Sequence, residues 1–180
     1  MNQNELNKIL ENHKLWLNDG YSGCRAILTD ATLRYAILTN ATLRYAILTN
    51  ADLTGADLTD AILTNADLTG ADLTDADLTN ADLTNADLTD AILTDAILTD
   101  AILTNADLTD ATFNNGTVFP KGFDPIVRGM KLAEGEEVEV AAGTAAAKTL
   151  REELSEVLAK HGFDLVSLAI QPSKKHTNQG

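Results

Sequence analysis

Apolar positions recur every five residues from Ala26 to Asn115, and this spacing limits what the chain can fold into. These ninety residues divide into eighteen uninterrupted units that all begin with Ala, and seventeen of them carry Leu at the third place. The last unit carries Phe113 there. On an α-helix, five residues advance about 500°, so the Leu side chains would spiral around the axis. On one continuous strand, an odd period would send successive Leu side chains to opposite faces.

A chain that turns a corner every five residues resolves this conflict. Each Leu, and the Ala two places before it, then points toward a common axis. Four corners close a coil of about twenty residues, and successive coils stack by parallel backbone pairing at roughly 4.8 Å. The repeats would form about 4.5 coils in a column roughly 22 Å tall. The pattern therefore predicts an all-β solenoid.

The tandem units AILTN, ADLTG, ADLTD and ADLTN resemble the A(D/N)LXX motif of the pentapeptide repeat family. The resemblance covers half the chain, with Phe113 as its one exception in the core, and implies a right-handed quadrilateral parallel β-helix. First- and third-place side chains would point inward and second-place side chains outward. The string NELNKILENHKLWL is similar to the N-termini of many cyanobacterial members. Residues 31–40 recur verbatim as 41–50, which is typical of recent duplication or of a consensus-like, engineered member.

The residues before the repeats predict a helical cap over 1–25. Residues 2–18 have the apolar spacing of an amphipathic helix, with Asn2 or Asn4 as its N-cap and Gly20 as its stop. An uncovered first coil would expose unpaired backbone, so we expect this helix to cover it. His13 lies on the apolar side, where we expect it to pack and not to bind a ligand.

The residues after the repeats predict three further segments. The β-helix is expected to span 26–118, with Val118 as its last inward side chain. Residues 119–130 contain two Pro, which break strand pairing, and should fold over the last coil. Residues 131–180 read as a small β-α-β-like α/β appendage with a frayed tail. Its Leu residues at helical spacing form a possible interface for self-association: Leu150, Leu154 and Leu158.

The outward second place holds Asp in eight units, Ile in seven and Thr in three. Because units four apart should stack, acid gathers in the middle coils and aliphatic side chains gather toward both ends. The candidate partner-binding residues are Asp52, Asp57, Asp67, Asp72, Asp77, Asp82 and Asp87. A belt of three consecutive outward Ile residues fits either an interface or the β-branched filling that strands favour: Ile92, Ile97 and Ile102.

The negative charge belongs to the repeats. Of the formal net charge of −14, residues 26–115 contribute −13, from fifteen Asp and two Arg. Over about 22 Å this is about one charge per 1.7 Å, close to the linear charge density of duplex DNA. The family resemblance agrees, since quinolone-resistance members resemble duplex DNA and bind DNA gyrase. One hypothesis is therefore a DNA mimic that binds a protein such as gyrase or topoisomerase, with no direct contact to nucleic acid.

Two departures from the quinolone-resistance members stand against that hypothesis, and two other functions fit the repeats. The repeats lack the projecting loop that some topoisomerase-protecting members need, and the C-terminal piece is longer than their dimerising segment. The chain could instead be a passive structural or assembly module, natural or designed, that oligomerises through its C-terminal segment. Ice binding is a third hypothesis, because Thr follows Leu in fifteen units. Interleaved Asp, however, makes those Thr columns irregular and heavily hydrated.

The sequence predicts no enzyme, no cofactor and no metal site. It contains no Gly-rich phosphate loop, metal-spaced Cys/His cluster or nucleophile elbow. Asp at regular spacing on a convex surface offers no pocket to enclose an ion. Cys24 is the single cysteine, expected to be half-buried near the column entrance, and its isolation fits a reducing, cytoplasmic location. We expect no secretory signal and no membrane association.

Overall fold

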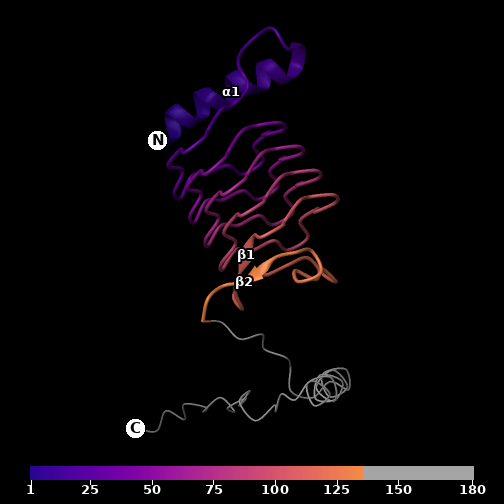
Figure 1. Cartoon of the computed structure of the whole chain (residues 1–180). Helices are drawn as coiled ribbons and strands as arrows, with labels where there is room; N and C mark the ends of the chain where they lie inside the picture. The colour runs from indigo at the N-terminus through magenta and orange to yellow at the C-terminus, as the bar shows by residue number, and fades with distance from the viewer. Residues whose placement is uncertain (136–180) are drawn as a thin grey trace, which may run out of the picture. The chain divides into compact units, whose positions relative to one another are not determined.

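The computed structural model describes residues 1–135, which form a helix followed by a column of stacked coils (Figure 1). The predictions for the appendage beyond Gly135, including the interface at Leu150, Leu154 and Leu158, lie outside the described residues. No helix within residues 1–135 is long and apolar enough to cross a bilayer.

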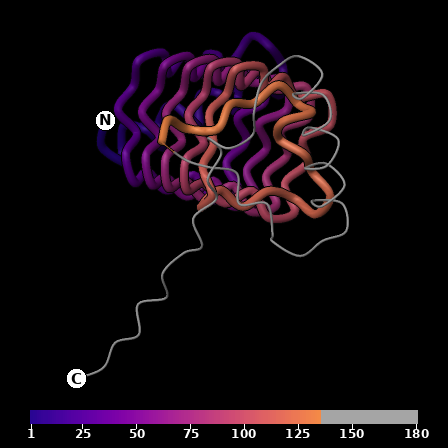
Figure 2. The backbone as a smooth tube through the Cα atoms, turned by 60° about the horizontal axis from the view of Figure 1, so that its bottom comes forward, coloured from indigo at the N-terminus to yellow at the C-terminus, as the bar shows by residue number. Residues whose placement is uncertain are grey.

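Parallel pairing joins second-place residues twenty positions apart, from Ile27 with Ile47 to Ile92 with Thr112. The second-place N–H donates to a first-place carbonyl of the preceding coil, as from Ile47 to Ala26 at 3.0 Å. The third-place N–H donates to a second-place carbonyl of the following coil, as from Leu28 to Ile47 at 2.7 Å. The predicted stacking of units four apart is therefore confirmed, and the coils follow one another along the column (Figure 2).

The interior of the column is a ladder of Leu and Ala. Every third-place Leu from Leu28 to Leu108 is buried, and Phe113 is buried at the end of the ladder. The first-place Ala residues are buried too, except Ala31 and Ala41, which are partly buried against the same core. Burying one Leu side chain contributes roughly 2 kcal/mol, so this ladder is the main source of stability. The predicted inward first and third places of the repeats are confirmed.

Each corner of the coil needs a residue in the left-handed backbone region, and the fifth place supplies it. From Asp30 to Asp110, the fifth-place φ lies between 55° and 66°. Gly, Asn and Asp adopt this conformation most readily, and they fill nearly all of these positions. The exceptions are Tyr35 and Tyr45, whose neighbouring Arg guanidinium groups lie 5.7 Å and 5.5 Å from the ring centroids.

Helix α1 (Gln3–Asp19) precedes the column and matches the predicted helix to within one residue at each end. Asn2 caps its N-terminus in a capping box with Glu5, and Gly20 ends it with φ 73°. Leu6 is buried on its inner face. The helix lies across the first coil (Figure 1).

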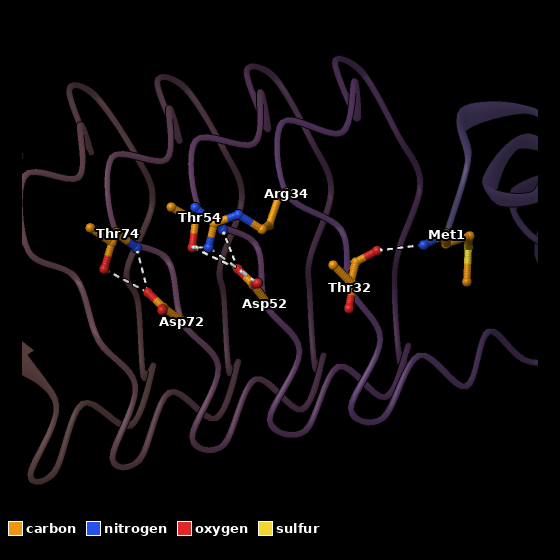
Figure 3. Close-up of polar contacts among 7 residues, drawn as sticks. All are labelled: Met1, Thr32, Arg34, Asp52, Thr54, Asp72 and Thr74. Carbon is orange, nitrogen blue, oxygen red and sulfur yellow. Dashed lines mark hydrogen bonds and ion pairs between the residues drawn. The ribbon is translucent and has the colours of Figure 1, made fainter.

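Polar groups of α1 and its flanks occupy the upper backbone edge of the first coil. The Gln3 side-chain amide donates to the Ile37 carbonyl at 2.9 Å and accepts from the Ile37 N–H at 3.0 Å. The Met1 ammonium donates to the Thr32 carbonyl at 2.9 Å (Figure 3). In the later coils, the N–H and the carbonyl of the second-place residue both bond to the backbone of the preceding coil. The Gln3 amide therefore substitutes for a strand residue.

The opposite end of the column is closed by a chain segment rich in Phe. Strand β1 (Thr112–Phe113) pairs in parallel with strand β2 (Lys131–Leu132), so backbone pairing continues past residue 130. Between them, the Phe119 ring packs edge-on against Phe113 and stacks on Phe123, with centroids 5.6 and 5.0 Å apart. Arg128 donates to the Ala106 carbonyl at 2.8 Å, which ties this segment to the coil above.

Two predicted placements were wrong. Val118 is 45% exposed and its backbone pairs with Ile97, so it occupies an outward second place. The pairing interval there is one residue longer than in the repeats, because Gly116 adds a residue to the corner, and Phe119 packs against the core instead. Cys24 is exposed and not half-buried.

Candidate protein-binding surface

The sides of the column carry the second-place aspartates, which cap the backbone of their own unit. In all eight such units, a carboxylate oxygen accepts from the Thr N–H two residues later, at 2.9–3.2 Å. Over most of the column, the first-, second-, third- and fifth-place N–H groups have backbone acceptors, either in the ladder or in the turn before the unit. The carboxylate supplies the acceptor for the fourth place, which explains why Asp favours the second place.

Thr hydroxyls add further bonds to the same carboxylates. Asp52 and Asp72 each accept from the hydroxyl of their own Thr at 2.6 Å (Figure 3). Three other carboxylates accept from a Thr of the preceding coil: Asp57 from Thr39 at 2.8 Å, Asp67 from Thr49 at 3.0 Å and Asp82 from Thr64 at 3.2 Å. The candidate aspartates are therefore half-buried members of a polar network, except Asp87, which is exposed.

These bonds favour the ionised carboxylates. The Thr54 hydroxyl is the main cause that lowers the pKa of Asp52, and Thr59 and Thr84 act alike on the pKa of Asp57 and Asp82. Burial alone would raise the pKa of Asp67, but hydrogen bonds from Thr69 and Thr49 outweigh it and leave that pKa lowered. Asp52, Asp57, Asp67 and Asp82 therefore hold their negative charge more firmly than a free Asp would.

The corners of the column carry the other seven Asp of the repeats, at the fifth place. All are exposed except Asp110, which is half-exposed. They are Asp30, Asp60, Asp75, Asp90, Asp95, Asp100 and Asp110. They are not among the predicted partner-binding residues, because that prediction rests on the second place alone. The alternation of Asp, Asn and Gly at every fifth place was the signal that could have found them.

The corner acids are unevenly distributed around the column. Units four apart share a corner, and one corner consists of Tyr45, Asn65, Asn85 and Asn105. The amide of Asn105 donates to that of Asn85 at 3.2 Å along this corner. All seven corner acids therefore lie on the other three corners, and the column has one neutral edge.

Few cations offset this charge. Within residues 1–135, the ion pairs are Arg34 with Asp52 at 3.4 Å and Lys131 with Asp110 at 2.7 Å. All four side chains are substantially exposed, so solvent screens both pairs and they add little to stability. Two pairs cannot neutralise fifteen repeat carboxylates. The described surface therefore remains strongly negative.

The predicted aliphatic belt lies on consecutive sides near the C-terminal end of the column. Ile92, Ile97 and Ile102 point outward and are 38–49% exposed. Val118 extends the belt, because it stacks directly after Ile97. Elsewhere in residues 1–135, no three His, Cys, Asp or Glu side chains gather in a way that would hold a metal ion.

The repeats match the model of a protein family described as pentapeptide repeats, in eight copies over residues 26–65, 36–75 and 76–115. This chain belongs to the pentapeptide repeat family. The matches together span 26–115, which is the column itself. No curated protein matches the chain.

The solved structures that are similar to this chain include two pentapeptide repeat proteins from cyanobacteria. A pentapeptide repeat protein from Nostoc PCC 7120 is 39% identical over 61% of this chain and 86% of its own, with a TM-score of 0.42. Rfr23 from the cyanobacterium Cyanothece 51142 is 36% identical over 57% of this chain and 69% of its own, with a TM-score of 0.55. A trypsin-treated QnrB1, a plasmid-mediated fluoroquinolone resistance protein, is 17% identical over 82% and 76%, with a TM-score of only 0.20. The pentapeptide repeat fold, a right-handed quadrilateral β-helix, is thus shared.

Proposed function

We propose that this pentapeptide repeat protein is a non-catalytic, cytoplasmic protein whose acidic column occupies the DNA-binding surface of a basic partner. The proposed partner is DNA gyrase or another topoisomerase. The observation that carries it is the number of carboxylates, fifteen within ninety residues, arranged at fixed spacing on a rigid ladder. The runner-up function is a passive structural or assembly module.

The two sets of acids would serve this function differently. The second-place set, which includes all seven candidates from Asp52 to Asp87, is ordered by Thr hydrogen bonds and supplies a fixed field. The fifth-place set lies exposed at three corners and would meet the partner's Lys and Arg side chains. A preorganised array loses little entropy on binding, and long-range attraction raises the association rate. With α1 capping the first of about 4.5 coils, the partner would meet the sides and not the ends.

Gyrase supercoiling, titrated with the full chain, tests the proposal. Inhibition that weakens as salt rises is expected, because charge provides the attraction. No effect at high micromolar excess would reject it.

Matched variants locate the surface. Asp60→Asn, Asp75→Asn, Asp95→Asn and Asp100→Asn together remove four exposed corner charges, and Asn already serves at other corners of this chain. The control combines Glu11→Gln and Glu134→Gln, which remove exposed negative charges outside the repeats. The corner variant is expected to lose at least tenfold in apparent affinity, and the control little. An unchanged corner variant would place binding elsewhere.

The exposed belt of Ile92, Ile97, Ile102 and Val118 supports the alternative, a module that self-associates. That function predicts a chain mass above one copy in light scattering, at concentrations where gyrase is unaffected. Because β2 ends at Leu132, the test for a role of the C-terminal segment is truncation after Gly135, which leaves the column intact. A mass that does not change on truncation would count against that segment.

A further inference from the structure

His13 is a buried titratable side chain in the contact between α1 and the first coil. It is fully buried, and its Nδ1 accepts a hydrogen bond from the Ala26 N–H at 3.1 Å. Ala26 is the first residue of the first repeat, so this bond joins helix to column. The Trp16 ring stacks on the imidazole, with centroids 5.6 Å apart and planes 14° apart.

The accepted bond fixes the protonation state of the ring. Because Nδ1 accepts, the single proton of the neutral imidazole lies on Nε2. Nε2 makes no hydrogen bond of normal geometry within the described residues. A second proton would have to enter at Nδ1, where it would face the Ala26 N–H, and a donor would then oppose a donor. The ring could not be charged and keep its bond to Ala26.

The surroundings of the ring also oppose a charge. Burial lowers the pKa of His13, and the nearby guanidinium of Arg25 lowers it further. The backbone carbonyl of Arg44, on the first coil, favours the charged ring but does not outweigh burial. When α1 leaves the coil, the ring gains access to water and its pKa returns toward about 6.5. Protons therefore bind the released helix more strongly than the docked one.

We propose that His13 is an acid-sensitive latch, which holds α1 on the first coil when neutral and releases it when protonated. The sign follows from linkage: the latch holds fully above about pH 6.5 and weakens below it, because the released state then binds more protons. Each pH unit below 6.5 shifts the docking equilibrium by up to about tenfold toward release. Release exposes the backbone edge at Thr32 and Ile37, which α1 otherwise occupies.

The fluorescence of Trp16, the only tryptophan in the chain, reports the titration. From pH 7.5 to 5.0, the full chain is expected to show a transition with a midpoint below 6.5. His13→Asn is the matched variant, because its amide oxygen can accept from the Ala26 N–H but gains no proton. It should show no transition, whereas His161→Asn should retain it. A transition that persists in His13→Asn would overturn the proposal.

Backbone amide hydrogen exchange distinguishes the release of α1 from protonation of His13 while α1 stays docked. After correction for intrinsic rates, the amides of Ala26 and Ile37 should exchange up to about tenfold faster at pH 5.5 than at pH 7.5. The amides of Leu68 and Leu73, deep in the column, should keep their protection in wild type and in His13→Asn, which verifies that both remain folded. If Ala26 and Ile37 stay protected while fluorescence changes, the ring titrates without release and the latch is refuted.

Discussion

The sides and the corners of the column carry nearly equal numbers of Asp, but they use the carboxylate in different ways. On the sides, Asp caps a Thr N–H of its own unit, as Asp57 does for Thr59 at 3.0 Å, and six of these eight Asp are half-buried. At the corners, Asp is exposed, and it suits the place because its backbone tolerates a positive φ, as at Asp60 with φ 57°. The same residue type is thus a structural cap on the sides and mainly an exposed surface charge at the corners.

Substitution of a core Leu is expected to have the largest effect on the free energy of unfolding. Leu73 is fully buried in the middle of the ladder, and Leu73→Ala removes its packing and leaves a cavity. We expect a loss of about 2–5 kcal/mol in the free energy of unfolding, measured by denaturant titration. A variant that unfolds with wild type would contradict the Leu ladder as the source of stability.

A corner is expected to be most sensitive where it lacks a side chain. Gly55 has φ +63°, and a Cβ there would lie 2.6 Å from the Tyr35 ring of the preceding coil. Gly55→Ala should cost about 1–2 kcal/mol, mostly from the left-handed backbone. Adding Tyr35→Ala removes the clash but keeps the left-handed backbone at residue 55, and Tyr35→Ala by itself controls for the lost Arg34 contact. Full recovery in the double variant would show that steric contact, and not backbone conformation, sets the cost.

Asp57→Ala and Asp60→Asn compare a side with a corner directly. Asp57→Ala leaves the Thr59 N–H without its carboxylate and should cost about 1 kcal/mol. Asp57→Asn keeps an acceptor and should cost less. Asp60→Asn should leave thermal stability nearly unchanged. If the Asp57 and Asp60 variants behaved alike, the division between sides and corners would fail.

The smallest expected effect is the loss at low pH of the stabilisation that Asp57 provides. Hydrogen bonding to Thr59 lowers the pKa of Asp57 in the folded chain below that of an unfolded Asp, about 3.9. Its contribution is therefore present above about pH 4 and is lost as pH falls through the folded pKa. The difference in melting temperature between wild type and Asp57→Asn should shrink between pH 5 and pH 2.5. A difference that stays constant over this range would contradict the carboxylate as a cap.

The fold was predictable because burial repeats locally: one Leu and one Ala in every five residues fix both the inward places and the corners. The helix was predictable from Asn2, Glu5 and Gly20, which signal its ends within a few residues of sequence. Val118 was missed because one inserted residue, Gly116, shifts the register without leaving any periodic trace.

The site was less predictable, since it depends on contacts that periodicity does not encode. A second-place Asp reads as an outward charge, and its bond to the following Thr appears only when the turn is built. The pairing of Gln3 with Ile37 joins residues 34 positions apart and has no sequence signature. The corner acids, by contrast, could have been found from the Asp, Asn and Gly pattern at the fifth place.

The twenty-residue interval of the backbone ladder also governs how such a chain can change length. Inserting four units would add one complete coil and return the chain to the same corner. The segments at both ends of the column would then keep their present contacts with the adjacent coil. Inserting two units, the length of the verbatim copy at 41–50, would turn everything downstream by half a circuit and carry the neutral edge to the opposite side. Insertion of four units therefore leaves each charged side of the column facing the same direction. Insertion of two units turns the charged sides downstream to the opposite direction.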